Sequence, residues 1–337
     1  MRYAPFDDYM TNFTTILKDL EPYYSTKYGK AFVGDTLKLI KGIPDNSIDL
    51  IMTSPPYGLR RKKEYGNADP EVYAKWFMPF AQEFFRVLKP TGSFVLNIGG
   101  GWETGKPVRS LYQFSLLLEL CKTFSFAEEF IWNKPATLPT PAEWVTIRRI
   151  RVKDSIEYVW WLSKTPYPKA DNRRVLQPYS ESMKALLKNG YRAKLRPSGH
   201  KISEKFGVDN KGSIPSNFLS ISNTESNSYY IRMCKEHNIK IHPARYPLKL
   251  PEFFVKFLTN KNDIVFDPFA GSNVTGEAAE KLERNWLAFE LSEEYLNGSK
   301  FRFDSDKDKI QTLERAPKAK KRNTQQKNLK DLLSYNS

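Results

Sequence analysis

The stretch Ser54-Pro55-Pro56-Tyr57 places a hydroxyl, a stiff backbone and an aromatic ring within four residues. Two consecutive prolines cannot donate to a strand ladder, so the apolar strand expected at 48–53 must end there. An isolated Pro-Pro pair is usually only structural. Here, however, the Ser54 hydroxyl and the Pro55 carbonyl are acceptors for both N–H bonds of an amine on a flat ring, and Tyr57 can stack on that ring and stabilise positive charge. The motif therefore predicts chemistry at an exocyclic amino group.

A second motif, Asp267-Pro268-Phe269-Ala270-Gly271-Ser272-Asn273, follows a predicted strand and opens a predicted helix. This is the position where α/β folds bind nucleotide-like ligands, and glycine lets the backbone approach the ligand closely. Glu290 ends the next predicted strand, where a carboxylate can accept both hydroxyls of a ribose. The motif lacks the lysine of a phosphate-binding P-loop, and Asn273 breaks the dinucleotide fingerprint. A ligand with an adenosine part and no phosphate remains, which suits S-adenosylmethionine.

Apolar strands alternate with helical segments around both motifs. Strands are expected at 31–34, 48–53, 93–98, 128–133, 156–163, 263–267 and 286–290, and helices at 36–41, 70–88, 108–124, 250–258 and 273–284. This alternation predicts an α/β fold with a mainly parallel sheet and both motifs at the carboxyl ends of strands. Between about 166 and 238 the pattern becomes loop-rich over a length that favours an inserted functional module.

Charge is distributed unevenly along the chain. The 337 residues have a formal net charge of +15, of which residues 148–211 carry +10 and residues 300–337 carry +6. A strongly basic segment on a near-neutral body favours a polyanionic partner such as nucleic acid. Arg60, Arg61, Lys62 and Lys63 directly follow the first motif. A run of this kind is usually a solvated face, but in this place it could clamp phosphates around an extruded base.

Composition excludes several other classes of protein. No apolar run approaches the roughly 18 residues needed to cross a bilayer, and the first ten residues have acidic residues where a secretory signal would have a basic one. Two cysteines are too few for a disulfide scaffold and typical of a reducing cytosol. We therefore expect a cytoplasmic protein without membrane association. No metal is expected, because Cys234, His237, His242 and His200 lack the regular spacing of zinc ligands.

Together, the two motifs resemble those of the amino-methylating DNA methyltransferases of the permuted beta order, in which the catalytic SPPY precedes the cofactor motif. The likeness covers residues 28–297 and extends to the PvuII-type N4-cytosine methyltransferases through 59–67, 150–165, 196–200 and 242–247. It implies a Rossmann-like methyltransferase fold with a mainly parallel seven-stranded sheet. The implied activity is methyl transfer from S-adenosylmethionine to the N4 amino group of cytosine in duplex DNA, with base flipping. CAGCTG is the target site that the likeness implies.

The same resemblance implies how the chain is divided and which cellular partners it has. Residues 1–165 would be the catalytic half, 166–240 a target-recognition module, 241–300 the cofactor-binding half, and 301–337 a basic, disordered tail. The protein would be the protective half of a restriction–modification system, with double-stranded DNA as substrate and a cognate endonuclease that shares its site. It would act at the nucleoid of a prokaryotic cell.

The resemblance also implies roles for individual residues. The catalytic residues would be Ser54, Pro55, Pro56 and Tyr57. The cofactor-binding residues would be Asp35, Asp267, Phe269, Gly271, Ser272, Glu290, His242 and Pro243. The DNA-binding residues would be Arg60, Arg61, Lys62, Lys63, Arg173, Arg174, Arg196 and His200. Many relatives have glycine where this chain has Asn273, but asparagine tolerates the left-handed conformation better than most residues, so we expect binding to be preserved.

Several alternatives remain open at this point. Serine before Pro-Pro-Tyr favours cytosine N4 in this family, but an N6-adenine enzyme would use the same mechanism. A non-catalytic DNA-binding protein with a degenerate methyltransferase fold is disfavoured, since both motifs are intact. Cytosine C5 methylation needs a nucleophilic cysteine, and Cys121 is interpreted as a residue of a helix core. An NAD-dependent oxidoreductase is disfavoured, because this chain lacks the glycine fingerprint of dinucleotide binding.

Overall fold

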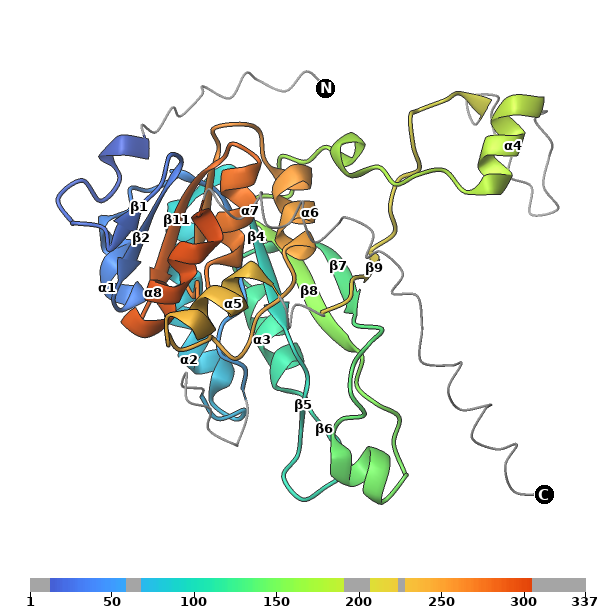
Figure 1. The fold of residues 1–337 in the computed structure, drawn as a ribbon, viewed down its shortest axis with the longest axis horizontal. Helices are drawn as coiled ribbons and strands as arrows, with labels where there is room; N and C mark the ends of the chain where they lie inside the picture. Colours follow the sequence, from blue (N-terminus) through green and yellow to red (C-terminus); the bar gives the residue numbers. More distant parts are fainter. Residues whose placement is uncertain (1–12, 59–67, 191–206, 224–227, 305–337) are drawn as a thin grey trace, which may run out of the picture.

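A computed structural model describes residues 13–58, 68–190, 207–223 and 228–304 (Figure 1). Nine strands of these residues form one sheet. In spatial order they are β1 (Tyr24–Ser25), β2 (Gly29–Val33), β11 (Asn285–Glu290), β10 (Ile264–Asp267), β3 (Ile48–Thr53), β4 (Leu88–Ile98), β8 (Ile156–Ser163), β7 (Ser125–Asn133) and β9 (Phe218–Ser220).

The sheet is mainly parallel, as the sequence predicts. From β2 through β11, β10 and β3 to β4 all neighbours are parallel, whereas β8 is antiparallel to both β4 and β7. The expected seven strands are all present. The two additional ones are the short strands β1 and β9, which extend the sheet at its edges.

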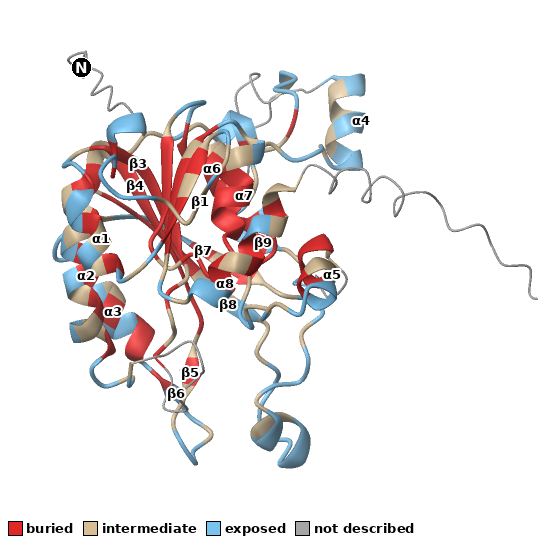
Figure 2. Ribbon diagram, turned by 60° about the vertical axis from the view of Figure 1, so that its left-hand side comes forward, coloured by how far each residue is buried: buried red, intermediate tan, exposed pale blue. Residues whose placement is uncertain are grey.

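Helices cover both faces of the sheet (Figure 2). The helices α1 (Thr36–Leu39), α2 (Tyr73–Val87) and α3 (Tyr112–Leu120) pack on one face, and α6 (Lys249–Leu258), α7 (Val274–Lys281) and α8 (Glu293–Ser299) on the other. The alternation within β3 explains the two layers, because Ile51 joins one apolar cluster and Leu50 and Met52 join the other. No helix among the described residues is long and apolar enough to span a membrane.

Two expected boundaries differ from the structure. The segment Pro90–Gly92, expected to end a helix, lies inside β4, which already starts at Leu88 and pairs there with the first residue of β3. The helix expected from 108 begins at Tyr112, because Arg109–Ser110 (β6) pairs with Gly101–Trp102 (β5) as a hairpin. Cys121 was expected in a helix core, but it is exposed, because α3 ends beside it.

The described residues of 166–240 do not form one compact unit. A 3-10 turn, Asn172–Val175, packs against α6, whereas α4 (Glu181–Asn189) projects from the body (Figure 1). Farther along the chain, β9 joins the sheet and α5 (Tyr229–Glu236) packs against α8 and the 3-10 turn Lys300–Phe303. This last turn lies in the expected tail, yet its Arg302 is only 5% exposed and pairs with buried Glu277 at 2.8 Å. The rest of the expected tail, 305–337, lies outside the described residues.

A second projection, the arm, consists of residues 101–110 and 134–155. Its first part is the β5–β6 hairpin that follows β4, and its second part connects β7 to β8 and includes a short π-helical turn, Glu143–Ile147. Because β4 and β7 both end where the arm begins, the arm leaves the sheet at the carboxyl edge of β3 and β4. Figure 1 shows that the arm and α4 project from opposite ends of the molecule.

Candidate active site

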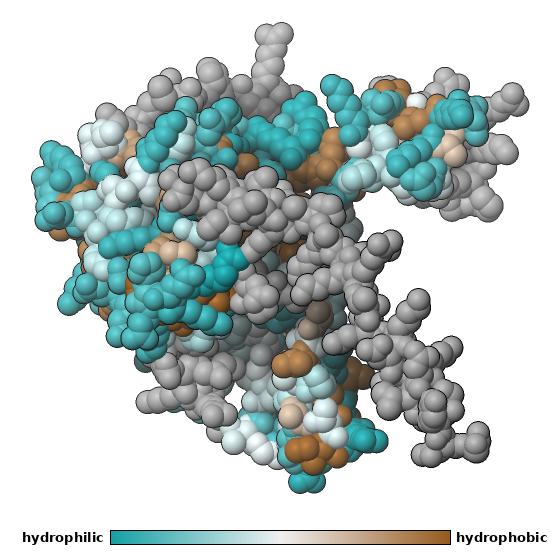
Figure 3. All heavy atoms as spheres, viewed as in Figure 1, coloured by the Kyte–Doolittle hydropathy of each residue, from teal (hydrophilic) through white to brown (hydrophobic). Residues whose placement is uncertain are grey.

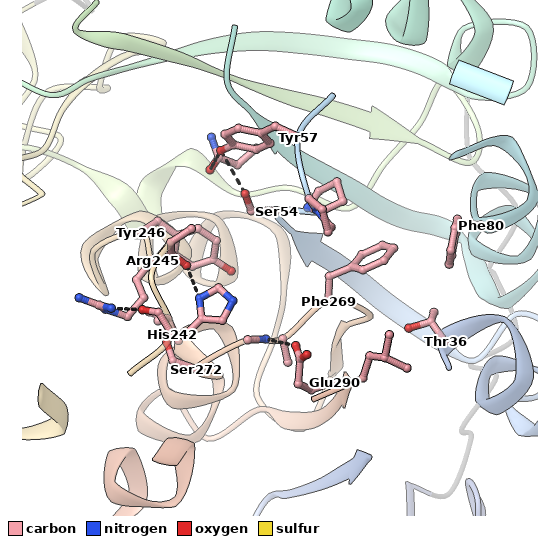
Figure 4. Close-up of a pocket in the computed structure, with 18 of the residues that line it drawn as sticks. Thr36, Ser54, Tyr57, Phe80, His242, Arg245, Tyr246, Phe269, Ser272 and Glu290 are labelled. Atoms are coloured by element: carbon pink, nitrogen blue, oxygen red, sulfur yellow. Dashed lines mark hydrogen bonds between the residues drawn. The ribbon is translucent and has the colours of Figure 1, made fainter. Parts of the chain in front are cut away.

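A cavity of about 1120 Å³ opens at the carboxyl ends of β3, β10 and β11. Side chains from both sequence motifs line it, and Figure 4 shows Ser54 and Tyr57 on one side and Glu290 and Ser272 on the other. Pockets for one drug-sized ligand usually have about 300–1,000 Å³. The volume of this cavity lies just above the upper end of that range.

The loop after β3 directs its polar groups into one hydrogen-bond chain. The Ser54 hydroxyl donates to the phenol oxygen of Tyr57 at 3.2 Å, and the phenol donates to Oε2 of Glu157 at 2.7 Å. Burial and the nearby charge of Glu157 raise the pKa of Tyr57 well above its usual value, so the phenol stays protonated and donates. Tyr73 of α2 donates to the carbonyl of Pro56 at 2.8 Å, which holds the loop against the helix layer.

Sequence reasoning missed Glu157 and Asn97, both of which line the cavity. Glu157 is the second residue of β8, Asn97 is near the end of β4, and the antiparallel pairing of these strands brings them together. The Asn97 amide donates to Glu157 at 3.1 Å, and Lys134 lies 2.5 Å from the other carboxylate oxygen. A carboxylate at the start of an otherwise apolar strand is the one signal for Glu157 in the sequence.

Gly99 allows β4 to end directly against the Tyr57 ring. A Cβ at this position would lie 2.6 Å from Cε2 of Tyr57, which no side chain tolerates. The phenol of Tyr112 donates to the Gly99 carbonyl and fixes this contact from the side of α3.

The second motif forms a tight turn around a carboxylate. Gly271 has φ +53°, and its N–H donates to Oε2 of Glu290 at 2.7 Å, while Ser292 N–H donates to Oε1 at 2.9 Å. Burial raises the pKa of Glu290. A carboxylate has about four acceptor positions, and these N–H groups do not fill all of them, so Glu290 can still accept a hydroxyl hydrogen.

Asp267 joins the two motifs from beneath the cavity and is not among the residues that line it. It is 2% exposed and accepts hydrogen bonds from Thr53 and Thr275, each at 2.7 Å, and from the backbone N–H of Phe269 at 3.1 Å. Thr53 directly precedes the Ser54 loop, so Asp267 fixes the position of one motif relative to the other. Burial raises the pKa of Asp267.

His242 covers the turn at Gly271. A Cβ on Gly271 would lie 3.0 Å from Nε2 of His242, so the imidazole ring packs directly on the Gly271 backbone. The carbonyl of Ala244 lies 2.6 Å from Nδ1, which must therefore carry the proton. Burial lowers the pKa of His242 to about 4, so the ring is neutral at pH 7. Pro243 also lines the cavity.

Two further residues support the turn. Asn273 has the left-handed conformation that the sequence predicts, with φ 55° and ψ 46°, and its side chain caps α7 by accepting from Gly276 at 3.1 Å. Arg302, which the sequence analysis assigned to the tail, donates to the backbone oxygen of Ser272 at 2.6 Å and to its hydroxyl at 3.0 Å.

An aromatic wall closes the side of the cavity next to α2. The ring of Phe269 lies 5.1 Å from that of Phe80 and 6.2 Å from that of Trp76. Asp35 also lines the cavity, and its carboxylate caps α1 by accepting from Leu37 N–H at 2.9 Å. Phe269 therefore offers an aromatic face to a flat ring in the cavity.

The predicted site residues fall into three groups: those at the cavity, those at the opposite edge of the sheet, and those outside the described residues. All four predicted catalytic residues line the cavity, and so do all predicted cofactor residues except Asp267. Arg173 and Arg174 lie at the opposite, amino-terminal edge of the sheet, where Arg174 donates to the Thr259 carbonyl just before β10. Outside the described residues lie Arg60, Arg61, Lys62, Lys63, Arg196 and His200. Within the described ranges no three His, Cys, Asp or Glu side chains form a group able to hold a metal ion.

The chain is similar to known DNA methyltransferases. A family model described as DNA methylase matches residues 48–301. The type II methyltransferase M.PvuII of Proteus hauseri is 50% identical over 84% of this chain and 86% of its own length. M.BglII of Bacillus subtilis is 30% identical over 80% of this chain and 67% of its own length. A solved structure of the cytosine-N4-specific PvuII DNA methyltransferase superposes with a TM-score of 0.69, at 43% identity over 87% of this chain and 93% of that chain.

Proposed function

The chain belongs to the DNA methylase family, and from this premise we propose that it transfers a methyl group from S-adenosylmethionine to the N4 amino group of cytosine in duplex DNA. One observation carries the proposal. The Ser54–Tyr57 loop and the Gly271–Glu290 turn open into a single cavity of about 1120 Å³, in which a donor and a base would meet. The relative that is 50% identical and the solved structure that is 43% identical to this chain are both PvuII methyltransferases. The name of the solved structure specifies cytosine N4.

The residues around Gly271 fit the methyl donor. Glu290 would accept the ribose hydroxyls, and the adenine would lie against Phe269 near Asp35. Gly271, Ser272, His242 and Pro243 would surround the rest of the donor, because a neutral imidazole can lie beside a cationic sulfonium without repulsion. When bound, S-adenosylmethionine supplies an electrophilic methyl group.

The hydrogen-bond chain from Ser54 explains how the loop would bind an amine. The hydroxyl hydrogen of Ser54 is directed to Tyr57, whose own hydrogen is directed to Glu157. The lone pairs of Ser54 are then available to accept an N–H of the target amine. With the Pro55 carbonyl as second acceptor, the amine nitrogen would be drawn towards tetrahedral geometry, which makes it a better nucleophile.

The proposed reaction requires that the cytosine leaves the duplex. The cavity reaches the ends of buried strands, and Pro55 and Asn97 on its wall lie within the body of the protein. A base that is stacked in a duplex cannot reach these groups, whereas an extruded base can. The ring of Tyr57 would then stack on the extruded cytosine.

The cellular role follows from the same proposal. We infer that the chain protects DNA within a restriction–modification system and acts on nucleoid DNA in a prokaryotic cell, with CAGCTG as the first sequence to test. A cognate endonuclease would cleave the same site. Site recognition is proposed for the inserted segment 166–240, with Arg196 and His200. The run from Arg60 to Lys63 is proposed to contact phosphates.

Product identification tests the proposed function. Purified protein, labelled S-adenosylmethionine and a duplex with CAGCTG are expected to give N4-methylcytosine on nucleoside mass spectrometry. If N6-methyladenine is the only product, the target base is adenine and not cytosine. If no duplex yields a methylated nucleoside, the proposal is refuted. Methylation mapping of DNA from cells that express the chain would give the target sequence.

A further inference from the structure

The arm combines positive charge with exposed apolar side chains. Its 32 residues include seven Lys or Arg and three Asp or Glu, which gives a net charge of +4. Five of the eighteen exposed large hydrophobic residues in the described part of the chain lie on it. They are Val108, Leu138, Ile147, Ile150 and Val152. Figure 3 shows brown apolar atoms beside teal polar atoms at the lower end of the molecule. Such a concentration of apolar groups indicates an interaction surface.

The arm is held in a defined shape. The carboxylate of Asp154 accepts from Trp102 Nε1 at 2.8 Å and from Arg109 at 2.9 and 2.5 Å. Arg151 donates twice to the Pro107 carbonyl, at 2.9 and 2.6 Å. These bonds join the hairpin to the 134–155 segment, so the exposed apolar groups belong to an ordered surface.

Both ends of the arm are rooted in the cavity wall. Gly99, which contacts the ring of Tyr57, is two residues before the hairpin. Trp132 and Glu157 line the cavity on the two strands that flank the second segment, and Lys134 at its start pairs with Glu157. A base in the cavity would stay covalently attached to its duplex, with the root of the arm beside it.

We propose that the arm holds duplex DNA beside the extruded base, with Arg149 and Lys153 on backbone phosphates and Ile150 and Val152 against the sugar–base surface. This rests on the proposed function and assigns DNA contacts to residues of the arm that were not among the individual DNA-binding residues expected from the sequence. Charge complementarity supports DNA as the occupant, since Arg149 and Lys153 are exposed and lie next to the apolar pair. A second copy of the chain fits less well, because a two-fold contact would oppose two surfaces of charge +4.

A charge-removal variant tests the electrostatic part. The arm variant combines Arg149→Gln and Lys153→Gln. The control variant combines Lys122→Gln and Lys261→Gln, which removes the same charge from two exposed lysines elsewhere on the body. Binding to a duplex with CAGCTG is measured by fluorescence anisotropy over a salt series. We expect the arm variant to raise Kd about tenfold, and to reduce the slope of log K against log salt by about 1.8, for two lost phosphate contacts. The control should behave like the unmodified protein, and an unchanged slope in the arm variant would overturn the proposal.

A second variant tests the apolar part and the competing occupant. Ile150→Ser with Val152→Ser should weaken DNA binding about three- to tenfold and leave the salt slope unchanged. Both residues are exposed, so folding, checked by circular dichroism, should not change. Sedimentation velocity is measured on the same samples. If the variant dissociates an oligomer and binds DNA normally, the arm is a contact between copies of the chain and the proposal is wrong.

These binding measurements separate the arm from the chemistry. Kd for S-adenosylmethionine, and kcat at saturating DNA, should stay within about twofold of the unmodified protein in both arm variants. Weakened DNA binding by the arm variants in a protein that forms no methylated product would support the arm and refute the proposed function. If the arm variants methylate DNA normally and bind it as tightly as the unmodified protein, the proposed function is supported and the proposal for the arm is refuted.

Discussion

The phenol of Tyr57 donates a 2.7 Å hydrogen bond to Oε2 of Glu157, a residue 100 positions farther along the chain. Because a carboxylate only accepts, this bond fixes the direction in which the Tyr57 and Ser54 hydrogens point. Glu157 is thereby a positioning residue for the proposed catalytic loop.

Replacing Glu157 by Ala is expected to lower kcat about 10- to 100-fold, because hydrogen bonds to a charged group contribute about 1.5–3 kcal/mol. The KM for the methyl donor should stay unchanged, since Glu157 lies on the side of the cavity opposite Glu290. Glu157→Gln keeps an acceptor for Tyr57 and should recover part of the rate. Glu129→Ala on the exposed face of β7 is the control, and an equal loss of rate there would indicate a general effect on the sheet.

Replacing Ser54 by Ala removes the proposed acceptor for the target amine. We expect kcat to fall about 100-fold, comparable to the loss of one preorganised donor in other active sites, while the donor Kd changes less than twofold. Ser115→Ala, on an exposed position of α3, serves as the matched control. Single-turnover rates and calorimetric titration with the donor give the two quantities. If both change by the same factor, Ser54 belongs to donor binding.

Replacing Gly271 by Ala should weaken donor binding at least tenfold. The new Cβ would occupy a left-handed position and lie 3.0 Å from His242, so the turn around Glu290 must shift. Gly105→Ala isolates the backbone component, because Gly105 also has positive φ but has open space around the Cβ position. The control should lose about 1 kcal/mol of stability and no donor affinity. Equal donor affinity in the two variants would contradict the expected contact with His242.

The stability of the protein should fall in mild acid because of His242. Its pKa is lowered from 6.5 to about 4, mainly by burial, so between these values the unfolded chain binds a proton that the folded chain does not. The contribution of neutral His242 is therefore complete above pH 6.5 and is lost as the pH falls towards 4. Urea unfolding at about pH 7, 5.5 and 4.5 should show a smaller loss for His242→Asn than for the unmodified chain.

The parallel part of the fold and both loops of the site follow from local sequence patterns. The apolar run at 48–53 ends at two prolines, and the run at 263–267 ends at a glycine turn, so both strand ends and their loops are visible in the chain itself. Asn273 also adopts the left-handed conformation expected of it. These features depend on residues close together in sequence, which a pattern can report.

The contacts that the sequence did not reveal are long-range. Glu157 reaches Tyr57 only because β8 inserts antiparallel next to β4, and Arg302 reaches Ser272 only because the chain folds back after α8. Arg173 and Arg174 show the opposite case. DNA contact stays a prediction for both, and what the sequence did not show is that the path of the chain places them at the amino-terminal edge of the sheet, where Arg174 binds the Thr259 carbonyl.

The order of the strands also determines when the molecule can become active during its synthesis. Strands β10 and β11 occupy the middle of the sheet, between β2 and β3, although they are made about 200 residues later. Until the ribosome has released residue 290, β2 and β3 therefore have no partner between them, and the Ser54 loop has no Asp267 beneath it. A nascent or truncated chain would lack the assembled site, so methylation capacity should appear only after translation is essentially complete.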